Sequence, residues 1–557
     1  MEKNFVKILS SFIIAILLSF SLALFASCQK NTATSQSEKN KNTTYYVDSQ
    51  NGNDNNNGLS PETAWRSLAK AGEHMYQAGE KLLLKRGSVF YGSLKIQANG
   101  TASRPVIVDA YPDDTTRPLP LINARGHLAG VQITNSNYLK INHLEIVSNA
   151  GNPVVPEAKN QRYGVLAEAS AGFHSSHIVL NALYVHQIFA SAQVPAGGQN
   201  PTSNMGMGIC FSSTTDGTFS DITIKNCRIA FTGHTGIKIK TDAQDTTLFT
   251  HHVNILNNRL NDIGGPGIQP GKCVDVLVSG NLVDHSGSMV DPRMHGRGSG
   301  IWPWRCTNVL IEHNTFMYAH GKMDSHGAHI DFGCRNVVIQ YNMSISNGGG
   351  FVEILGNDHN CCYRYNISIN DGWRVKGVDG AMQNGEILFI SNYTGHNMPK
   401  KGPFNNYIYN NTIYVKKGIV SGFSLAPTTS GLLVANNIFY ILGKTQTTIR
   451  NGENIPGAKM KNVLFINNLY RFRGTLPASL PVHDSLPLYG DPGFAFPGGL
   501  KATDYIPANA ALIKNKGIPI EKLPGDSIGL TIGLTVKKDI LGNPITGKPD
   551  MGAVEMK

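Results

Sequence analysis

The sequence predicts an all-β fold, a right-handed parallel β-helix solenoid with a short N-terminal capping helix, on three observations. An apolar residue, two further positions and an Asn return together many times along the chain. Neighbouring returns between Asn258 and Asn366 lie 23, 33, 28 and 24 residues apart, within the range of stacked structural repeats. The chain is 41% hydrophobic and only 16% charged, which excludes a disordered polymer.

The recurring Asn is expected to occupy one turn of each coil. A single segment buries too little apolar surface to be stable alone, so the coils must stack about 4.8 Å apart as parallel strands. Stacked Asn side chains can then bond to one another in a ladder. Antiparallel sandwiches would not repeat Asn at one phase, and propeller blades repeat at longer, more regular intervals. The predicted rungs are Asn142, Asn181, Asn258, Asn281, Asn314, Asn342, Asn366, Asn411, Asn437 and Asn468.

The N-terminal end of the solenoid is expected to carry a helix. Ser60 is an N-cap residue type, Pro61 suits the first helical position, and Glu62 suits the first turn. The following AWRSLAKAGEHMYQAG, residues 64–79, is compatible with an amphipathic helix. Such a helix would cover the open end of the first coil, which otherwise invites edge-to-edge aggregation.

Residues 1–28 are expected to form a lipoprotein signal peptide. Lys3 and Lys7 precede a short apolar run, and small residues lead to Cys28 as the lipidated residue, although Phe25 stands where such motifs usually have Leu. An ordinary signal peptide with an incidental Cys is the alternative. Residues 29–43 are polar and predict a flexible tether, and residues 44–557 a single β-helix domain. The protein is thus expected to be exported, held at the bacterial cell envelope by its lipid alone.

Seven cysteines follow Cys28, an odd number that does not suggest a disulfide framework. Cys273, Cys306 and Cys334 hold matching places in successive repeats, so they are expected to stack as small buried side chains. Whether Cys361 or Cys362 forms a disulfide stays open. No Cys/His spacing indicates a zinc site.

Four segments give the chain a more specific resemblance. They are TYYVDSQNGNDNNNGLSPETAWRSLAKA, LLLKRGSVFYGSL, GDPGF and GNPITGKPDMGAVE, which lie at the two ends of the predicted solenoid. The chain resembles bacterial right-handed parallel β-helix proteins of the pectate-lyase-like superfamily. That resemblance implies a carbohydrate-active protein, and it leaves lyase, hydrolase, epimerase and non-catalytic binding members open.

One row of side chains is expected to point outward from a second strand of each coil. Counting 13 residues back from the ladder Asn places Ile301, His329 and Glu353 at equivalent positions, and Asp379 joins them if Asn392 is a rung. Side chains at one phase of stacked strands point to the same face. We therefore expect a polar row that can bind an extended substrate.

The leading functional hypothesis is a polysaccharide lyase acting on a uronic-acid-containing glycan by β-elimination. This reaction needs a base and a cation that neutralises the uronate carboxylate. The resemblance implies Lys or Arg as the base, and Lys376 with Arg374 in DGWRVKG is the best pair, since alternation would place both on one strand face. An ordinary solvated strand face explains the same residues.

A glycoside hydrolase is the first alternative. Asp331, Glu353 and Asp379 would supply the acid and the base or nucleophile, with His326 and His329 orienting them. The substrate-binding residues expected beside the catalytic groups are His295, Arg297, His326 and Asp379. Trp302 and Trp304 share one strand face and form a sugar-stacking platform if outward; the match of Trp304 with Phe332 favours the core.

The expected partner is an anionic polysaccharide bound by a monomer. The formal charge of +11 and an isoelectric point near 9.1 favour an anion, and no nucleic-acid-binding motif is present. Ca²⁺ is a candidate cofactor, with Asp358 and Asp371 as candidate ligands, although no ordered oxygen-ligand spacing is present. A non-catalytic glycan-binding surface lipoprotein is the second alternative.

Overall fold

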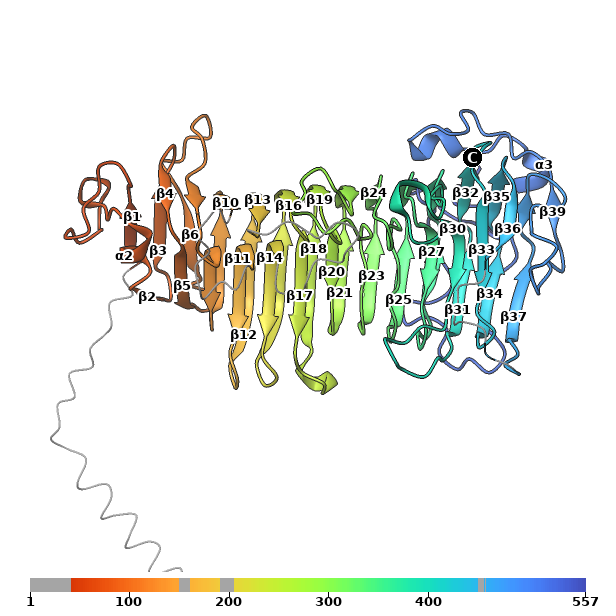
Figure 1. Ribbon diagram of the computed structural model, residues 1–557, viewed down its shortest axis with the longest axis horizontal. Coiled ribbons are helices and arrows are strands. Elements are labelled where there is room, and N and C mark those ends of the chain that lie inside the picture. The colour runs from red at the N-terminus through yellow and green to blue at the C-terminus, as the bar shows by residue number, and fades with distance from the viewer. Residues whose placement is uncertain (1–41, 150–160, 191–204, 449–454, 456, 557) are drawn as a thin grey trace, which may run out of the picture. The chain divides into compact units, whose positions relative to one another are not determined.

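The structure is a computed structural model that describes residues 42–149, 161–190, 205–448, 455 and 457–556. Residues 42–557 make one compact unit. Its strands stack in parallel along the long axis, from β1 near one end to β39 near the other (Figure 1). The predicted β-helix is confirmed: segments leading to Asn281, Asn314, Asn342 and Asn366 pair as adjacent parallel strands. The signal peptide, Cys28 and the tether as far as residue 41 lie outside the described residues.

Each coil contributes strands to up to three faces, here called A, B and C in chain order. Face A contains β1 (Thr44–Val47), β3 (Lys81–Lys85), β6 (Val106–Tyr111), β9 (Asn137–Asn142), β12 (His174–Asn181), β15 (Thr218–Lys225), β18 (Thr250–Leu256), β21 (Cys273–Ser279), β23 (Thr307–Glu312), β25 (Arg335–Gln340), β28 (Cys362–Arg364), β31 (Phe404–Tyr409), β34 (Ser430–Ala435) and β37 (Lys461–Ile466). The short strand β2 (Met75–Gln77) pairs with β5 (Leu94–Asn99), which lies at the junction of faces A and C.

Face B is continuous through the molecule. Its strands are β4 (Val89–Tyr91), β7 (Leu121–Asn123), β10 (Glu145–Asn149), β13 (Tyr184–Phe189), β16 (Arg228–Thr232), β19 (Arg259–Ile263), β22 (Leu282–Ser286), β24 (Thr315–Met317), β26 (Met343–Ile345), β29 (Ile367–Ile369), β32 (Thr412–Val415), β35 (Ile438–Ile441), β38 (Leu469–Tyr470) and β39 (Leu488–Tyr489).

Face C is interrupted in its middle. Beyond β5 it contains β8 (Ala129–Thr134), β11 (Arg162–Ala169), β14 (Gly206–Ser213), β17 (Ile237–Thr241), β20 (Ile268–Pro270), β27 (Gly350–Ile354), β30 (Glu386–Ile390), β33 (Ser421–Leu425) and β36 (Thr445–Thr447). Between β20 and β27 isolated parallel bridges carry the pairing across: Ile268–Ile301, Gly271–Trp304, Ile301–Ala328, His326–Gly350 and Ile330–Ile354. The loop that carries Asp324 lies in this interruption, and the loop after β30 completes the wall of the candidate site.

The asparagine ladder is confirmed from Asn258 to Asn468. The side-chain amide of Asn258 donates to Asn281 Oδ1 at 2.9 Å, and Asn314 continues the row to Asn342 at 3.0 Å. The row ends when Asn468 donates to Asp484 Oδ2 at 2.7 Å. Each rung is buried, so the ladder satisfies turn amides that water cannot reach.

Asn142 and Asn181 do not belong to this ladder. They pair with each other two residues before the ladder position, at the half-buried end of face A, where Asn181 Nδ2 donates to Asn142 Oδ1 at 3.2 Å. At the ladder position itself, the coil before Asn258 carries Cys227, whose backbone amide donates to Asn258 Oδ1 at 2.9 Å. An Asn two residues before the ladder position follows the same apolar pattern as a ladder Asn, so the sequence does not distinguish them. The prediction that Asn142 and Asn181 are ladder rungs is therefore wrong.

Aliphatic side chains from all three faces fill the interior of the solenoid as one continuous core cluster. The seven described cysteines are free and buried. The expected stack is confirmed, because the Cys273 amide lies 3.4 Å from Cys306 Sγ and the Cys306 amide 3.4 Å from Cys334 Sγ. Cys361 and Cys362 form no disulfide.

A row of glycines lines the corner between faces B and C. Its members are Gly130, Gly164, Gly208, Gly236, Gly267, Gly300 and Gly327, which follow one another in register. A Cβ atom on Gly267 would lie 2.5 Å from the Gly300 carbonyl oxygen and 2.5 Å from Val283 Cγ1. No side chain fits there, so glycine is required by space. The row ends at Phe351, the residue in register with Gly327.

The predicted capping helix over residues 64–79 is wrong in length. Ser60 caps a single 3₁₀ turn, η1 (Pro61–Thr63), and the α-helical part is one turn, α2 (Leu68–Ala71). Trp65 instead forms a parallel bridge with Val47, and Tyr76 is buried in β2. Pairing with the first coils therefore outweighs helix propensity in this segment.

The remaining helices among the described residues are equally short. They are η3 (Thr246–Leu248), η4 (Val378–Gly380), η5 (Ala502–Tyr505) and α3 (Ala510–Ile513). Within the part of the chain that the structure describes, no helix has the length and apolar character needed to cross a membrane.

Candidate active site

The interrupted part of face C presents a polar row, as the sequence predicts, but with two different members. The bridges place Trp302, His329 and Glu353 side by side on neighbouring coils, followed by Phe389. His329 and Glu353 are equivalent as expected. Trp302 replaces Ile301, because this coil is one residue shorter between the row and the ladder Asn. Asp379 is not in the row; it lies exposed in η4.

A cavity of about 660 Å³ opens above this row. Its ionisable lining includes Arg297, Asp324, His329, Asp331 and Glu353. The rest of the wall is formed by Met323, Phe332, Leu355, Gln383, Phe389, Ser391, Asn392, Tyr393, His396 and Lys400. Concave sites with convergent ionisable groups are the usual place for binding and catalysis.

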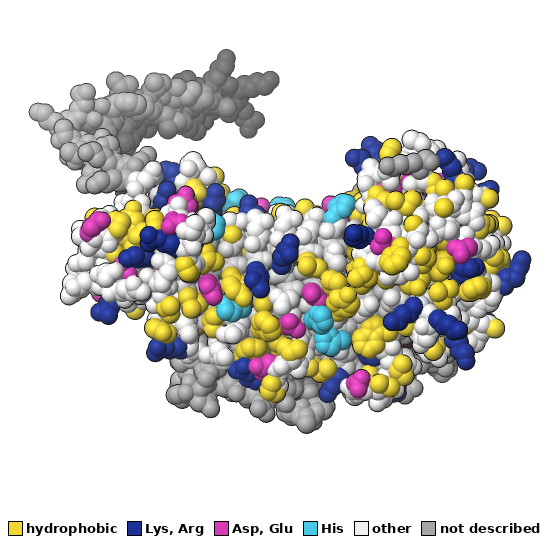
Figure 2. Space-filling view, turned by 90° about the horizontal axis from the view of Figure 1, so that it is seen from above, with side chains coloured by type: hydrophobic (Ala, Val, Ile, Leu, Met, Phe, Trp, Pro, Cys, Tyr) yellow, Lys and Arg dark blue, Asp and Glu magenta, His cyan; other side chains and the backbone are white. Residues whose placement is uncertain are grey.

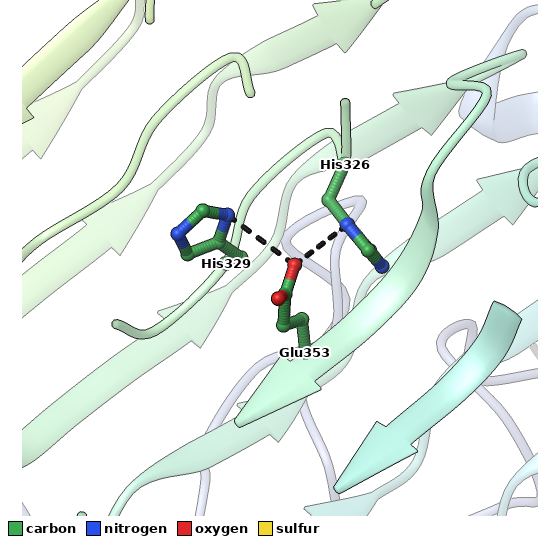
Figure 3. A group of neighbouring side chains, drawn as sticks. All are labelled: His326, His329 and Glu353. Atoms are coloured by element: carbon green, nitrogen blue, oxygen red, sulfur yellow. Dashed lines mark ion pairs between the residues drawn. The ribbon is translucent and has the colours of Figure 1, made fainter. Parts of the chain in front are cut away.

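Glu353 lies between two histidines (Figure 3). Its Oε2 atom is 2.6 Å from His326 Nδ1 and 3.3 Å from His329 Nδ1, and all three side chains are buried. Ser299 Oγ lies 2.9 Å from His329 Nδ1, and the Trp302 ring stacks on the His329 ring with centroids 4.9 Å apart. These contacts hold Glu353 as the partner of two imidazoles.

His326, His329 and Glu353 are the one group of at least three His, Cys, Asp or Glu side chains, among the described residues, with ligand atoms close enough for one metal ion. The 2.6 Å contact between Glu353 and His326 matches a charge-assisted hydrogen bond. Two ligands at about 2.1 Å from one tetrahedral zinc would be roughly 3.4 Å apart. The 2.6 Å spacing between Glu353 and His326 therefore favours a hydrogen-bonded network over a formed metal centre.

Asp358 and Asp371 do not form the suggested Ca²⁺ site. Both are buried and serve as turn acceptors: Asp358 Oδ1 accepts from the Cys334 amide at 2.7 Å, and Asp371 Oδ1 accepts from the Asn347 amide at 2.8 Å. Neither belongs to a converging ligand group among the described residues. Burial raises the pKa of Asp371 to about 6, so its carboxyl suits a hydrogen-bonded turn.

Asp324 is held by an arginine. Asp324 Oδ2 is 2.7 Å from Arg297 Nε and 2.5 Å from Arg297 Nη2. Burial alone would raise the pKa of Asp324, but the charge and hydrogen bond of Arg297, together with His329, outweigh burial and lower that pKa. Asp324 is therefore a carboxylate at neutral pH.

Asp331 shows the opposite shift in the same cavity. Burial raises its pKa to about 8, and the nearby Asp324 and Glu353 charges act in the same direction. The Phe332 amide donates a hydrogen bond to Asp331 Oδ1 at 2.8 Å. Asp331 is therefore largely protonated at neutral pH, and the cavity combines one carboxylic acid with one carboxylate. Such a pair can perform general acid–base chemistry.

Arg374 holds the loop that carries Asp324. Its guanidinium donates to the carbonyl of Gly321 at 3.0 Å, to Ser325 Oγ at 2.6 Å and to the carbonyl of Gln383 at 2.9 Å. The guanidinium also bonds to the carbonyl of Met323. Arg374 is only 5% exposed, so it acts inside the protein and cannot clamp a substrate carboxylate.

The expected pairing of Arg374 and Lys376 on one strand face is wrong. Residues 371–377 form no strand; Arg374 turns inward while Val375 and Lys376 are exposed. Glycine at 372 and 377 has φ of 77° and 87°, and these left-handed turns break the alternation that a strand would impose. Lys376 does not line the cavity.

Other expected residues are divided between the site and its surroundings. Arg297 lines the cavity, whereas His326 lies behind Glu353. His295 packs against His234 with ring centroids 4.7 Å apart, outside the cavity lining. Trp304 is half-buried and in register with Asp331, so its expected place in the core is wrong and it faces outward.

Four ionisable cavity residues were not expected in the site: Asp324, Tyr393, His396 and Lys400. Asp324 precedes Asp331 by seven residues in MDSHGAHID, a signal that a search for paired acids around one turn could have found. The other three belong to a loop after β30 whose position depends on tertiary packing. On the face shown in Figure 2, Lys and Arg side chains are dispersed among acidic ones, so the net positive charge forms no single patch there.

Comparison with known proteins gives matches consistent with this architecture. A family model described as a right handed beta helix region matches residues 208–393, which include most of the cavity wall. A lacto-N-biosidase from Bifidobacterium longum subsp. longum is 26% identical over 97% of this chain and 38% of its own length. The chain thus spans well under half of that curated relative.

Two solved structures resemble this one in fold. A GH136 lacto-N-biosidase from Eubacterium ramulus has a TM-score of 0.55 and 22% identity, covering 73% of this chain and 68% of that chain. XylC in complex with xylose has a TM-score of 0.51 and 13% identity, covering 92% of this chain and 98% of that chain. The strand register, the asparagine ladder and these matches together show a right-handed parallel β-helix fold.

Proposed function

We propose that this protein is a glycoside hydrolase in which Asp331 is the general acid and Asp324 the base or nucleophile. The observation that carries the proposal is the opposite pKa shift of these two carboxyl groups in one cavity. Glycoside hydrolysis needs one protonated carboxyl to donate to the leaving oxygen and one ionised carboxylate to attack the anomeric carbon or to activate water.

The surrounding residues fit these roles. Arg297 keeps Asp324 ionised, and burial keeps Asp331 protonated until a sugar oxygen takes its proton. The Oε2 atom of Glu353 contacts both His326 and His329, so Glu353 is a weaker candidate for the acid or base and serves as part of the cavity wall. Trp302 is half-buried and stacked on His329, where its ring can meet a sugar.

The hydrolase alternative is better supported than the lyase. The proposed lyase base Lys376 is outside the cavity and Arg374 is occupied by backbone carbonyls, whereas the curated relative is named a lacto-N-biosidase. We propose oligosaccharides that end in lacto-N-biose as the first substrates to test. The formal charge of +11 suggested an anionic glycan, so anionic glycans should be tested together with these oligosaccharides.

The test is hydrolysis of an aryl glycoside of lacto-N-biose, with polyuronates and neutral glycans assayed beside it. Asp331→Asn and Asp324→Asn should each lower kcat about 10²- to 10⁴-fold. Lys376→Ala and Asp379→Asn are exposed controls and should retain the parent rate. Unsaturated products that absorb in the ultraviolet, together with loss of activity in Lys376→Ala, would restore the lyase and refute the hydrolase.

A further inference from the structure

A second concave surface lies at the corner where face B ends. It encloses about 560 Å³ and is lined by His285, Tyr318, His320, Ser346, Asn370, Trp373, Lys416 and Ile419. None of these residues lines the cavity that contains Asp324 and Asp331.

Four of the lining residues form a row across consecutive coils. His285, Tyr318, Ser346 and Asn370 follow one another in register at the ends of β22, β24, β26 and β29. All four have left-handed φ angles, between 52° and 58°, which turn the chain and direct the side chains off the sheet. At about 4.8 Å per coil, the row is about 14 Å long.

The aromatic rings of this surface are fixed in place while one remains open to solvent. Trp373 is 41% exposed, and its indole Nε1 donates to the Ser346 carbonyl at 2.7 Å. The Tyr318 and His285 rings lie 5.2 Å apart between centroids. Fixed rings lose little conformational entropy when a ligand packs on them.

Polar side chains lie beside the aromatic rings, which distinguishes this surface from an apolar docking groove. His320, Ser346 and Asn370 supply imidazole, hydroxyl and amide groups within the same hollow. A pyranose ring offers C–H groups on its flat face and hydroxyl groups around its edge, so it requires an aromatic surface with hydrogen-bonding groups at the rim. An acidic or basic macromolecule would instead require clustered opposite charge, and Lys416 is the one Lys, Arg, Asp or Glu residue in this lining.

We propose that this second concave surface is a carbohydrate-binding site, in which a sugar ring stacks on Trp373 and the glycan continues along the row toward Tyr318. The choice of carbohydrate as the ligand rests on the proposed function. Trp373 directly precedes Arg374, which braces the loop of Asp324, so a glycan bound here lies on the segment that supports the active site. The site would keep a long glycan on the enzyme between cleavage events.

The test measures binding separately from catalysis. Asp331→Asn protein, which binds without cleaving, is titrated calorimetrically with a lacto-N-biose-terminated oligosaccharide and examined by affinity electrophoresis in gels containing xylan, galactan or a polyuronate. Trp373→Ala and Tyr318→Ala are then added singly to this background. Phe496→Ala is the matched control, since Phe496 is an aromatic residue 65% exposed elsewhere on the surface.

We expect Trp373→Ala to weaken retention by at least one glycan about tenfold, with Tyr318→Ala weaker in effect and Phe496→Ala unchanged. Retention equal to the parent in Trp373→Ala, or no retention by any glycan of the panel, would overturn the second site. A parent that releases no sugar but loses glycan binding through Trp373→Ala contradicts the hydrolase proposal alone. Unchanged circular dichroism of each variant confirms that the coils remain folded.

Discussion

Replacing Asp331 by Asn should make the protein more stable toward alkaline pH while it removes the proposed acid. The unfolded chain releases this proton near the ordinary value of 3.8, whereas the folded chain holds it to about pH 8. Between these values the folded state binds one proton more than the unfolded state, so stability falls as pH rises. Asn keeps the shape of the side chain and has no proton to lose.

The magnitude follows from the shift. Each pH unit between 3.8 and 8 removes about 1.4 kcal/mol from the free energy of unfolding of the parent relative to the variant. From pH 5 to pH 8 the difference should therefore grow by about 4 kcal/mol. The loss is confined to the coils around Asp331, because a solenoid transmits energy between neighbouring coils only.

Urea denaturation at pH 5, 6, 7 and 8, followed by tryptophan fluorescence, measures this difference near Trp302 and Trp304. The parent midpoint should fall relative to that of Asp331→Asn at each step. Asp379→Asn, an exposed substitution in η4, serves as the control and should run parallel to the parent. Parallel curves for the parent and Asp331→Asn would refute the burial of a protonated Asp331, and with it the assignment of the acid.

Three further outcomes test the fold and the proposals. Arg374→Ala releases the loop of Asp324, so kcat should fall about 10²-fold with a smaller change in KM. Arg374→Lys should recover little of this rate, because one ammonium group cannot replace the several donors of the guanidinium. Equal rates for Arg374→Ala and the parent would contradict the bracing role. Asn314→Ala removes a side chain that makes five hydrogen bonds and should lower the free energy of unfolding by about 3 kcal/mol. Asn142 is half-buried and outside the ladder, so Asn142→Ala should lower the free energy of unfolding by less than about 1 kcal/mol. Equal losses for the two variants in urea denaturation would contradict the stabilising role of the ladder. Cys28→Ala should yield an unlipidated protein in the soluble fraction, read by mass spectrometry and fractionation, and unchanged mass and fractionation would contradict lipid anchoring.

The repeated pattern made the architecture predictable, because successive coils use an Asn at the same turn to satisfy buried backbone amides. Asn281, Asn314 and Asn342 each lie two residues after the end of a face A strand and each bond to the next rung, so sequence phase and spatial phase coincide. The same reasoning aligned His329 with Glu353. It failed for Asn142 and for Ile301, where a coil differs in length or phase by one or two residues.

The candidate site was less predictable, because its key residues come from loops without a repeat. Asp324 stands between β24 and β25, and its position depends on Arg374 from two coils further along and on Arg297 from the coil before. The spacing of Arg374 and Lys376 matches the alternation of a strand, but left-handed glycines at 372 and 377 prevent a strand there. Such contacts between loops leave no periodic trace in the sequence.

The glycine row also bears on how this protein can be rebuilt. Engineers exchange coils between solenoids as interchangeable modules, and a donor coil is usually judged by its apolar pattern and its length. In this chain a donor coil placed between Gly208 and Gly327 must also bring a glycine to the corner of faces B and C, since a Cβ atom at Gly236 would lie 2.6 Å from the carbonyl oxygen of Gly267. A coil that lacks it would force its neighbours apart and disturb the register that His329 and Glu353 share. The choice of donor coils for redesigned specificity is therefore limited first by the need for glycine, whose side chain is a single hydrogen atom, at this corner.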